Sequence, residues 1–312
     1  MKIFNNLNIP KNYKHSAIAV GNFDGMHKGH QKVFDNTKKF AKKNKIKFGV
    51  LTFKPLPVMF FNKKVKNYRI VSEDEKFDLF KRYGADFVIN VKFNKTFSKI
   101  SAEQFIERII YKKINPKSLS VSSNFKFGRN RKGNINLLKK FSKIYDYKLL
   151  NINAFKYLGK TISSTRIRKY LMNGKINLAN KLLSRNWYIN GRVNQGRRIG
   201  RKLGYRTCNM RIKNYILPKT GIYSVKVLIA NEKKVHNGVA YLGSRPTFGG
   251  KKIFLETNIF NFKKNLYKKR LKVYFFKFIR IDKKFINSVK LIKQMKKDVT
   301  AAKKVLKAKL VI

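Results

Sequence analysis

Short apolar runs alternate with helix-length stretches through the first half of the chain. In the longer stretches, apolar residues recur every three or four positions, which is the spacing of one helix face. Strands that alternate with helices form βαβ units, so we expect a parallel sheet with helices on both faces. The runs that predict its strands are residues 17–20, 46–53, 86–91, 118–121 and 147–152.

Two capping boxes mark the starts of helices in this half. Ser72 with Glu75, and Ser101 with Gln104, have the spacing at which a hydroxyl and a carboxyl or amide side chain satisfy free backbone N–H groups. Each pair precedes apolar residues at helical spacing. Residues 169–184 continue as a helical segment with one interruption.

The pattern changes to strand-like alternation after residue 184. Several short strands without helices between them predict a small antiparallel barrel. A closing amphipathic helix is predicted from Phe285 to Leu306. We therefore place a domain boundary between residues 1–184 and residues 185–312. The predicted barrel strands are residues 187–193, 222–229, 235–242, 252–259 and 270–275.

Length and cysteine content narrow the class of protein. A chain of 312 residues with 43% hydrophobic residues is long enough for two ordinary domains. One cysteine, Cys208, excludes an internal disulfide framework and suits a reducing compartment. Residues 1–12 are polar, and no run approaches the roughly 18 apolar residues of a membrane span. We expect a cytoplasmic protein without a signal peptide or a membrane partner.

The charge is strongly positive. Lysine and arginine number 75 against 14 acidic residues, a formal net charge of +61. The basic residues are spread along the whole chain, whereas a nucleic-acid footprint is usually localised. We interpret the charge as part of a composition rich in Lys, Asn, Ile and Phe that would attract anionic substrates such as ATP. A basic nucleic-acid-binding protein is the alternative that the charge leaves open.

Residues 21–31, GNFDGMHKGHQ, lie where the first predicted strand passes into a helix. His27 and His30 are three apart, so in the first helical turn they share a face. Backbone N–H groups and the helix dipole there favour an anion, and Gly29 allows a ligand close to the backbone. The stretch predicts a phosphate site; the alternative is two surface histidines in a glycine-containing turn.

Two further stretches follow the fourth and fifth predicted strands. Residues 124–133 carry two phenylalanines, two glycines and two arginines, which could stack a flat ring and hold phosphates. Residues 162–168, ISSTRIR, place hydroxyls at a helix start, with Arg168 one turn inside. Taken alone, the first stretch is equally a basic surface loop, and the second an ordinary helix cap with a solvated arginine.

The second half carries a glycine-rich basic stretch. Gly196, Gly200 and Gly204 are four residues apart and are interleaved with basic residues, as in a loop that covers phosphates. Thr207 and Asn209, at the end of this loop, could supply oxygens to Mg²⁺. A nucleic-acid-binding loop and a long turn are the alternatives.

One acidic residue stands out in this half. Glu256 is one of two glutamates after residue 107 and lies within a predicted strand. A carboxylate there is either a solvent-facing strand residue or a site carboxylate.

In order, these motifs resemble those of the prokaryotic bifunctional riboflavin kinase/FAD synthetases. GxFDGxHxGH at residues 21–30, FxFG at 125–128 and ISSTxxR at 162–168 resemble the synthetase half. GxVxxGxxxGxxLG at residues 191–204 and LET at 255–257 resemble the flavokinase half. The resemblance covers nearly the whole chain. It implies an α/β Rossmann-like HxGH nucleotidyltransferase domain followed by a small antiparallel β-barrel flavokinase domain with a C-terminal helix.

The resemblance also implies a chemistry. ATP would phosphorylate riboflavin to FMN with Mg²⁺, and a second ATP would adenylylate FMN to FAD and pyrophosphate; only small-molecule partners are implied. The implied catalytic residues are Glu256 as base, with His27, His30 and Arg168 on phosphates. The implied nucleotide-binding residues are Gly21, Phe23, Asp24, Gly29, Ser163, Ser164, Thr165, Gly196, Gly200 and Gly204. The implied flavin-binding residues are Asn124, Phe125 and Phe127, and the implied metal ligands are Thr207 and Asn209.

The chain departs from the family pattern at several positions. Asn124 replaces an aspartate, and Leu56 replaces a histidine between two prolines. Residues 206–209 read Arg-Thr-Cys-Asn where the family has Pro-Thr-Ala-Asn. Arg206 removes a fixed φ and adds a charge beside the metal ligands. An FAD synthetase with a weakened kinase domain is therefore the second reading.

Overall fold

The computed structural model describes residues 1–65, 67–195, 204–247, 250–307 and 310–311. It divides into two compact units, which we call the first and the second unit. The first unit comprises residues 1–66 and 73–163, and the second comprises residues 67–72 and 164–312. No helix within the described ranges is both long and apolar enough to cross a membrane.

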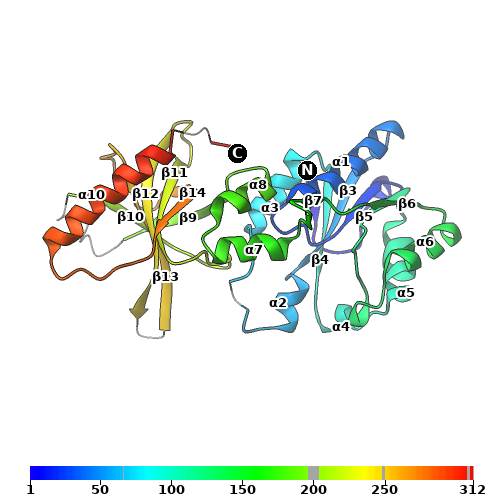
Figure 1. Ribbon diagram of the computed structural model, residues 1–312. Coiled ribbons are helices and arrows are strands. Elements are labelled where there is room, and N and C mark those ends of the chain that lie inside the picture. Colours follow the sequence, from blue (N-terminus) through cyan, green and yellow to red (C-terminus); the bar gives the residue numbers. More distant parts are fainter. Residues whose placement is uncertain (66, 196–203, 248–249, 308–309, 312) are drawn as a thin grey trace. The chain divides into compact units, whose positions relative to one another are not determined.

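The first unit contains a six-stranded parallel sheet (Figure 1). All four residues of its central strand β2 are at most 2% exposed, as expected for a strand covered on both faces. The five predicted strands are confirmed as β2 to β6, and the three-residue edge strand β1 is too short to show a period. In sheet order the strands are β1 (Lys2–Phe4), β4 (Phe87–Lys92), β3 (Phe48–Lys54), β2 (Ala17–Val20), β5 (Ser118–Ser122) and β6 (Lys148–Ile152).

Helices connect these strands. The capping box predicted at Ser101 is present, with Ser101 Oγ accepting the Gln104 N–H and Gln104 Oε1 accepting the Ser101 N–H. The short α5 continues as a π-helix, Phe105–Ile114, whose apolar face enters the main core. The helices are α1 (Lys28–Lys43), α2 (Pro57–Phe61), α3 (Glu73–Arg82), α4 (Lys95–Ser98), α5 (Ala102–Gln104) and α6 (Ile135–Ile144), and a small hairpin follows of β7 (Lys156–Tyr157) and β8 (Lys160–Thr161).

The second unit is built on a closed antiparallel barrel of six strands (Figure 1). Alternate residues of β11 from Tyr223 to Ile229 are at most 2% exposed and fill its interior, as their spacing predicts. The helix over residues 169–184 is confirmed as α7 (Ser164–Met172) and α8 (Ile176–Leu183), interrupted at Gly174 with φ +70°. In barrel order the strands are β10 (Thr207–Arg211), β13 (Gly250–Ile259), β12 (Val235–Thr247), β11 (Gly221–Ile229), β14 (Arg270–Arg280) and β9 (Tyr188–Asn194).

Two sequence predictions need correction here. The sequence places Thr207 and Asn209 at the end of a loop, whereas they lie in strand β10; these two polar residues hide the alternation of Cys208 and Met210. The C-terminal helix α10 (Ser288–Val305) begins three residues after Phe285, with Asn287 as its N-cap.

A short segment from the first half of the chain belongs to the second unit. The Arg69 N–H donates to Asn214 O at 3.2 Å, and Arg69 O accepts the Ile216 N–H at 2.7 Å. The indole N–H of buried Trp187 donates to Ile70 O at 2.6 Å. The division between units therefore falls at residues 163 and 164, with α7 and α8 on the barrel side, whereas the sequence places its domain boundary at residues 184 and 185.

Candidate active sites

The GNFDGMHKGHQ stretch forms a tightly wound loop between β2 and α1. Phe23, Gly25 and Met26 all have positive φ, at 47°, 88° and 42°. Such left-handed conformations are costly for non-glycine residues, and they cluster at functional sites. The winding buries Asp24 and His27 at 3% and 5% exposure.

His27 and His30 lie directly against each other at the start of α1. Their rings are stacked, with centroids 3.6 Å apart and planes 19° apart. His27 is the N-cap, and its Nδ1 accepts the His30 backbone N–H at 3.3 Å. In the neutral ring the proton is then on Nε2, which leaves that nitrogen as a donor.

Gly29 allows the loop that carries His27 and His30 to lie close to the start of the ISSTxxR stretch. A Cβ on Gly29 would lie 3.1 Å from His27 Cε1 and 3.9 Å from the carbonyl oxygen of Ile162. The absent side chain thus lets the His27 ring lie against the backbone. Within the first unit, the residue preceding Ser163 lies beside the two histidines.

Lys76 is a neighbour of this loop, although no motif of the sequence points to it. It is 2% exposed on α3, and its Nζ donates to Thr52 Oγ1 at 3.2 Å. Thr52 Oγ1 in turn donates to Asn22 O at 3.4 Å, inside the loop. Lys76 lies three and four residues before the buried Leu79 and Phe80, so a lysine at a core-facing helix position was the available signal.

The FxFG stretch is anchored by one of its two phenylalanines. Phe127 is 7% exposed and packs in the core of the first unit, while Phe125 is half-buried and stacks on it at 5.4 Å. A Cβ on Gly128 would lie 2.6 Å from the Ala102 backbone, so only glycine fits there. Asn124 is exposed, and its Oδ1 accepts the Ser122 hydroxyl at 2.8 Å.

The ISSTxxR stretch spans the division between units. Ser163 ends the first unit, whereas Ser164, Thr165 and Arg168 begin α7 of the second. Arg168 is buried rather than solvated: its guanidinium stacks 3.7 Å from the Tyr68 ring, and its Nε donates to Tyr68 O at 2.8 Å.

In the barrel, strand register brings the predicted kinase residues together. Glu256 pairs with Asn209, and Thr207 pairs with Asn258. Residues directly opposite in antiparallel strands point to the same face, so Thr207, Asn209 and Glu256 share one face. Intervening residues such as Leu255 are buried, so the shared face is the outer face of the barrel wall.

Asn209 provides the test of the predicted metal site. It is 7% exposed, and among the described residues its Oδ1 has no hydrogen-bond partner. The described ranges hold no group of three or more His, Cys, Asp or Glu that could bind a metal alone. Mg²⁺ is commonly held by one or two protein oxygens and substrate phosphates. The oxygens of Asn209 and Thr207 fit such a shared site.

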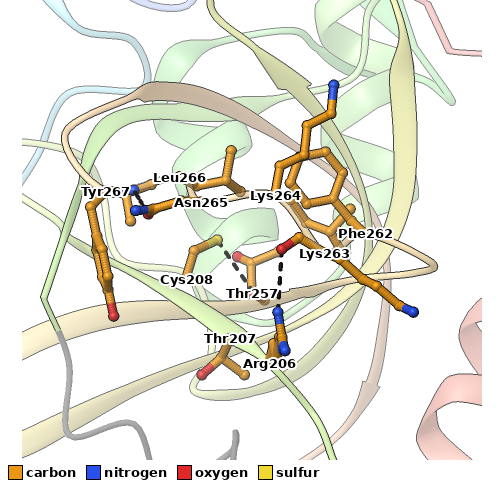
Figure 2. A pocket seen from close by; sticks show the side chains of 12 residues that line it. Arg206, Thr207, Cys208, Thr257, Phe262, Lys263, Lys264, Asn265, Leu266 and Tyr267 are labelled. Atoms are coloured by element: carbon orange, nitrogen blue, oxygen red, sulfur yellow. Dashed lines mark hydrogen bonds between the residues drawn. The ribbon is translucent and has the colours of Figure 1, made fainter.

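A pocket of about 370 Å³ opens next to Thr207 (Figure 2). Its walls combine apolar and polar side chains, and three cations belong to its lining, Arg206, Lys263 and Lys264. Arg206 Nη1 donates to Lys263 O at 3.3 Å, and Arg206 O accepts from Asn258 Nδ2 at 2.8 Å. The remaining lining residues are Val193, Thr207, Cys208, Thr257, Ile259, Phe262, Asn265, Leu266 and Tyr267.

Cys208 is a packing residue of this pocket rather than a reactive one. Burial raises the pKa of its thiol to about 12, so the thiol is neutral at physiological pH. Its Sγ donates to Thr257 O at 3.3 Å.

The predicted phosphate-covering loop is described only at its end. Gly196 and Gly200 lie outside the described residues. Gly204 has φ +79° with open space around it, a conformation that favours glycine.

Comparison with known proteins matches both halves of the chain. A family model described as FAD synthetase matches residues 9–166, and one described as riboflavin kinase matches residues 183–306. The chain belongs to the bifunctional riboflavin kinase/FMN adenylyltransferases. The predicted family, fold class and pair of activities are thereby confirmed.

Relatives that carry this family's name match over almost their full length. The protein of Buchnera aphidicola subsp. Schizaphis graminum is 40% identical, covering 95% of this chain and 96% of its own. That of Escherichia coli K12 is 31% identical, covering 92% and 91%. A crystal structure titled macrolide-efflux protein, from Streptococcus pneumoniae, has a TM-score of 0.86 and 28% identity, over 96% of this chain and 98% of that one. The family's architecture thus extends along the whole chain.

Proposed function

We propose that the residues described above carry out the family's two reactions in sequence, in the cytoplasm. The second unit phosphorylates riboflavin with ATP, and the first adenylylates the resulting FMN to FAD. The observation that carries the proposal is the register of β10 and β13, which aligns Thr207, Asn209 and Glu256 on one face in the half that matches riboflavin kinases.

In the kinase reaction, Glu256 accepts the proton of the riboflavin 5′-hydroxyl. The hydroxyl oxygen bonds to the γ-phosphorus of ATP, and the bond from that phosphorus to the β-phosphate oxygen breaks, releasing ADP. Thr207 and Asn209 would hold Mg²⁺, which neutralises triphosphate charge when bound. The neighbouring pocket takes the adenosine part of ATP, with Arg206 and Lys263 at the phosphate end.

In the adenylyl transfer, the FMN phosphate is itself the nucleophile. One of its oxygens bonds to the α-phosphorus of ATP, and pyrophosphate leaves. His27 and His30 stabilise the charge on the transferring phosphate, because both lie at the N-terminus of α1.

The remaining synthetase residues have supporting roles. Within the first unit, the Ser163 hydroxyl binds the departing phosphates. Phe125 stacks the flavin, with buried Phe127 as its support and Asn124 at the loop's edge. The loop residues Gly21, Phe23, Asp24 and Gly29 shape the nucleotide site.

Purified protein with ATP and Mg²⁺ tests the proposal in two arms, one given riboflavin and one given FMN, with flavins separated chromatographically. We expect FMN and FAD from riboflavin, and FAD from FMN. FAD from FMN without any FMN from riboflavin would favour the reading of a weakened kinase domain. No product in either arm would refute both activities.

A further inference from the structure

Tyr241 lies directly opposite the proposed base, although neither reaction above uses it. In the register of β12 with β13, Tyr241 pairs with Glu256, which in turn pairs with Asn209 of β10. Directly opposed residues of antiparallel strands share a face, with about 4.5–5.5 Å between their Cβ atoms. The neighbours of Tyr241 along β12, Ala240 and Leu242, are buried and point into the barrel. Tyr241 therefore continues, on the outer face, the row that Asn209 and Glu256 begin.

The phenol of Tyr241 connects this face to the segment that follows the last barrel strand. A Cβ on Gly243 would collide with the Tyr241 hydroxyl, so the ring lies across a position that only glycine leaves open. The hydroxyl donates to Asp282 Oδ2 at 2.8 Å. Asp282 belongs to residues 281–287, which join β14 to α10 and which we call the β14–α10 loop. The hydrogen bond thus holds this loop against the face that carries Glu256.

The order of the row indicates which substrate lies on this side. Strand β13 lies between β10 and β12, so Glu256 has Asn209 on one side and Tyr241 on the other. In phosphoryl transfer the attacking and leaving oxygens lie roughly in line, on opposite sides of the phosphorus. Asn209 is on the side of the metal and the triphosphate. Riboflavin, which brings the attacking hydroxyl, therefore approaches Glu256 from the side of Tyr241.

The β14–α10 loop offers a surface that suits a flat and largely apolar ring system. The side chains of Ile281 and Ile286 are 54% and 87% exposed, and neighbouring exposed apolar residues are typical of binding surfaces. The loop is held at both ends, because Arg280 Nη1 donates to Ile281 O at 2.8 Å and Asn287 caps α10. Between these ends, the bond from Tyr241 fixes the loop at Asp282.

We infer that Tyr241 is a positioning residue for riboflavin. By holding Asp282, its hydroxyl keeps the β14–α10 loop beside Glu256, where the loop covers the flavin ring and aligns the 5′-hydroxyl with the carboxylate. The inference rests on the proposed kinase function. Because Tyr241 acts through the loop, loss of its hydroxyl weakens riboflavin binding and leaves the phosphoryl transfer itself unchanged.

Tyr241→Phe tests the inference, because phenylalanine keeps the ring and removes only the hydroxyl. We expect the KM for riboflavin to rise about tenfold, as for the loss of one hydrogen bond to a charged group. The kcat of FMN formation and the KM for ATP should stay within about twofold. Asp282→Ala should raise the KM for riboflavin equally, and the double variant should be no worse, because all three lack the same contact. Asp282→Asn keeps an acceptor oxygen and should retain the original KM.

Glu232→Ala is the matched control, because it removes an exposed acid from another loop of the barrel; it should change neither KM. An unchanged KM for riboflavin in Tyr241→Phe would overturn the inference, as would additive effects of Tyr241→Phe and Asp282→Ala. A lower kcat with the riboflavin KM unchanged would also overturn it, by placing Tyr241 among the reacting groups. A raised KM for ATP alone would do the same, by placing the triphosphate on this side.

If the original protein makes no FMN, the kinase proposal fails by itself. Quenching of riboflavin fluorescence by the protein in the presence of ADP and Mg²⁺ then decides the role of Tyr241. Binding to Tyr241→Phe that is about tenfold weaker supports the inference. Equal binding, or no binding to the original protein, overturns it.

Discussion

One charged pair, Arg280 with Asp298, joins the C-terminal helix α10 to strand β14 of the barrel. Arg280 of β14 donates to Asp298 of α10 through Nε at 2.8 Å and through Nη2 at 2.7 Å. The two side chains are 16% and 6% exposed, and Gln294 Nε2 donates to the same carboxylate at 3.0 Å. Asp298→Asn keeps the shape but removes the charge and turns an N–H toward Arg280.

Removing one partner of a buried pair costs about 3–5 kcal/mol, because the other charge is left uncompensated. Arg280 reaches solvent in part, so we expect a loss of about 2–3 kcal/mol from the free energy of unfolding of the second unit. For a unit of this size that corresponds to a fall of roughly 4–12 °C in melting temperature.

Urea unfolding followed by tryptophan fluorescence measures this loss. Trp187 is the only tryptophan, is 1% exposed and lies in the second unit, so its signal reports that unit. Glu232→Gln is the matched control, because it neutralises an exposed acid that faces His236 at 3.6 Å; it should leave the midpoint unchanged. Arg280→Met combined with Asp298→Leu should recover most of the loss. A midpoint for Asp298→Asn equal to that of Glu232→Gln would refute the reasoning.

Four further outcomes are expected. Glu256→Gln should lower the kcat of FMN formation by about 10²–10⁴ and leave adenylyl transfer from supplied FMN intact. His30→Ala should instead lower the rate of adenylyl transfer about 10²-fold and leave FMN formation intact. Loss of both activities in either folded variant would contradict the presence of two separate sites. Lys76→Met should slow adenylyl transfer about tenfold through the displaced loop while FMN formation is unchanged; equal rates would contradict the loop contact. Cys208 should react with iodoacetamide at pH 8 far more slowly in native protein than in urea, as mass spectrometry would detect. Because burial raises the pKa of the Cys208 thiol from 9.0 to about 12, the contribution of the buried neutral thiol to the free energy of unfolding is present below pH 9 and is lost as the pH rises toward 12. Rapid labelling of the native protein would contradict the burial of this thiol.

Periodicity predicted the elements that bury a regular apolar face. Strands β2 and β11 are such cases, since every residue of β2 is buried and alternate residues of β11 from Tyr223 to Ile229 are buried. It missed β10, where polar site residues alternate with Cys208 and Met210. It also missed the docking of residues 67–72 on the second unit, because this depends on backbone hydrogen bonds to residues far along the chain, which leave no local pattern.

In the candidate sites, too, the sequence pattern did not identify every residue or explain why the predicted residues lie together. Resemblance selected Thr207, Asn209 and Glu256, but only the pairing of β10 with β13 explains why these three share a face. Lys76 and Tyr241 escaped selection, since what distinguishes each is the hydrogen bond of its polar atom, which depends on the tertiary fold.

Arg206 stands where the family has a proline, and the contacts of the arginine can be compared with what a proline would do. A proline there would fix φ ahead of Thr207, the proposed metal ligand. In this chain two hydrogen bonds fix residue 206 instead: Asn258 Nδ2 donates to Arg206 O, and Arg206 Nη1 donates to Lys263 O. Asn258 is the register partner of Thr207, so the contact holds the start of β10 against β13. The guanidinium is directed to the loop that lines the proposed nucleotide pocket, where a positive charge would attract a triphosphate. These contacts favour a working kinase over a weakened one.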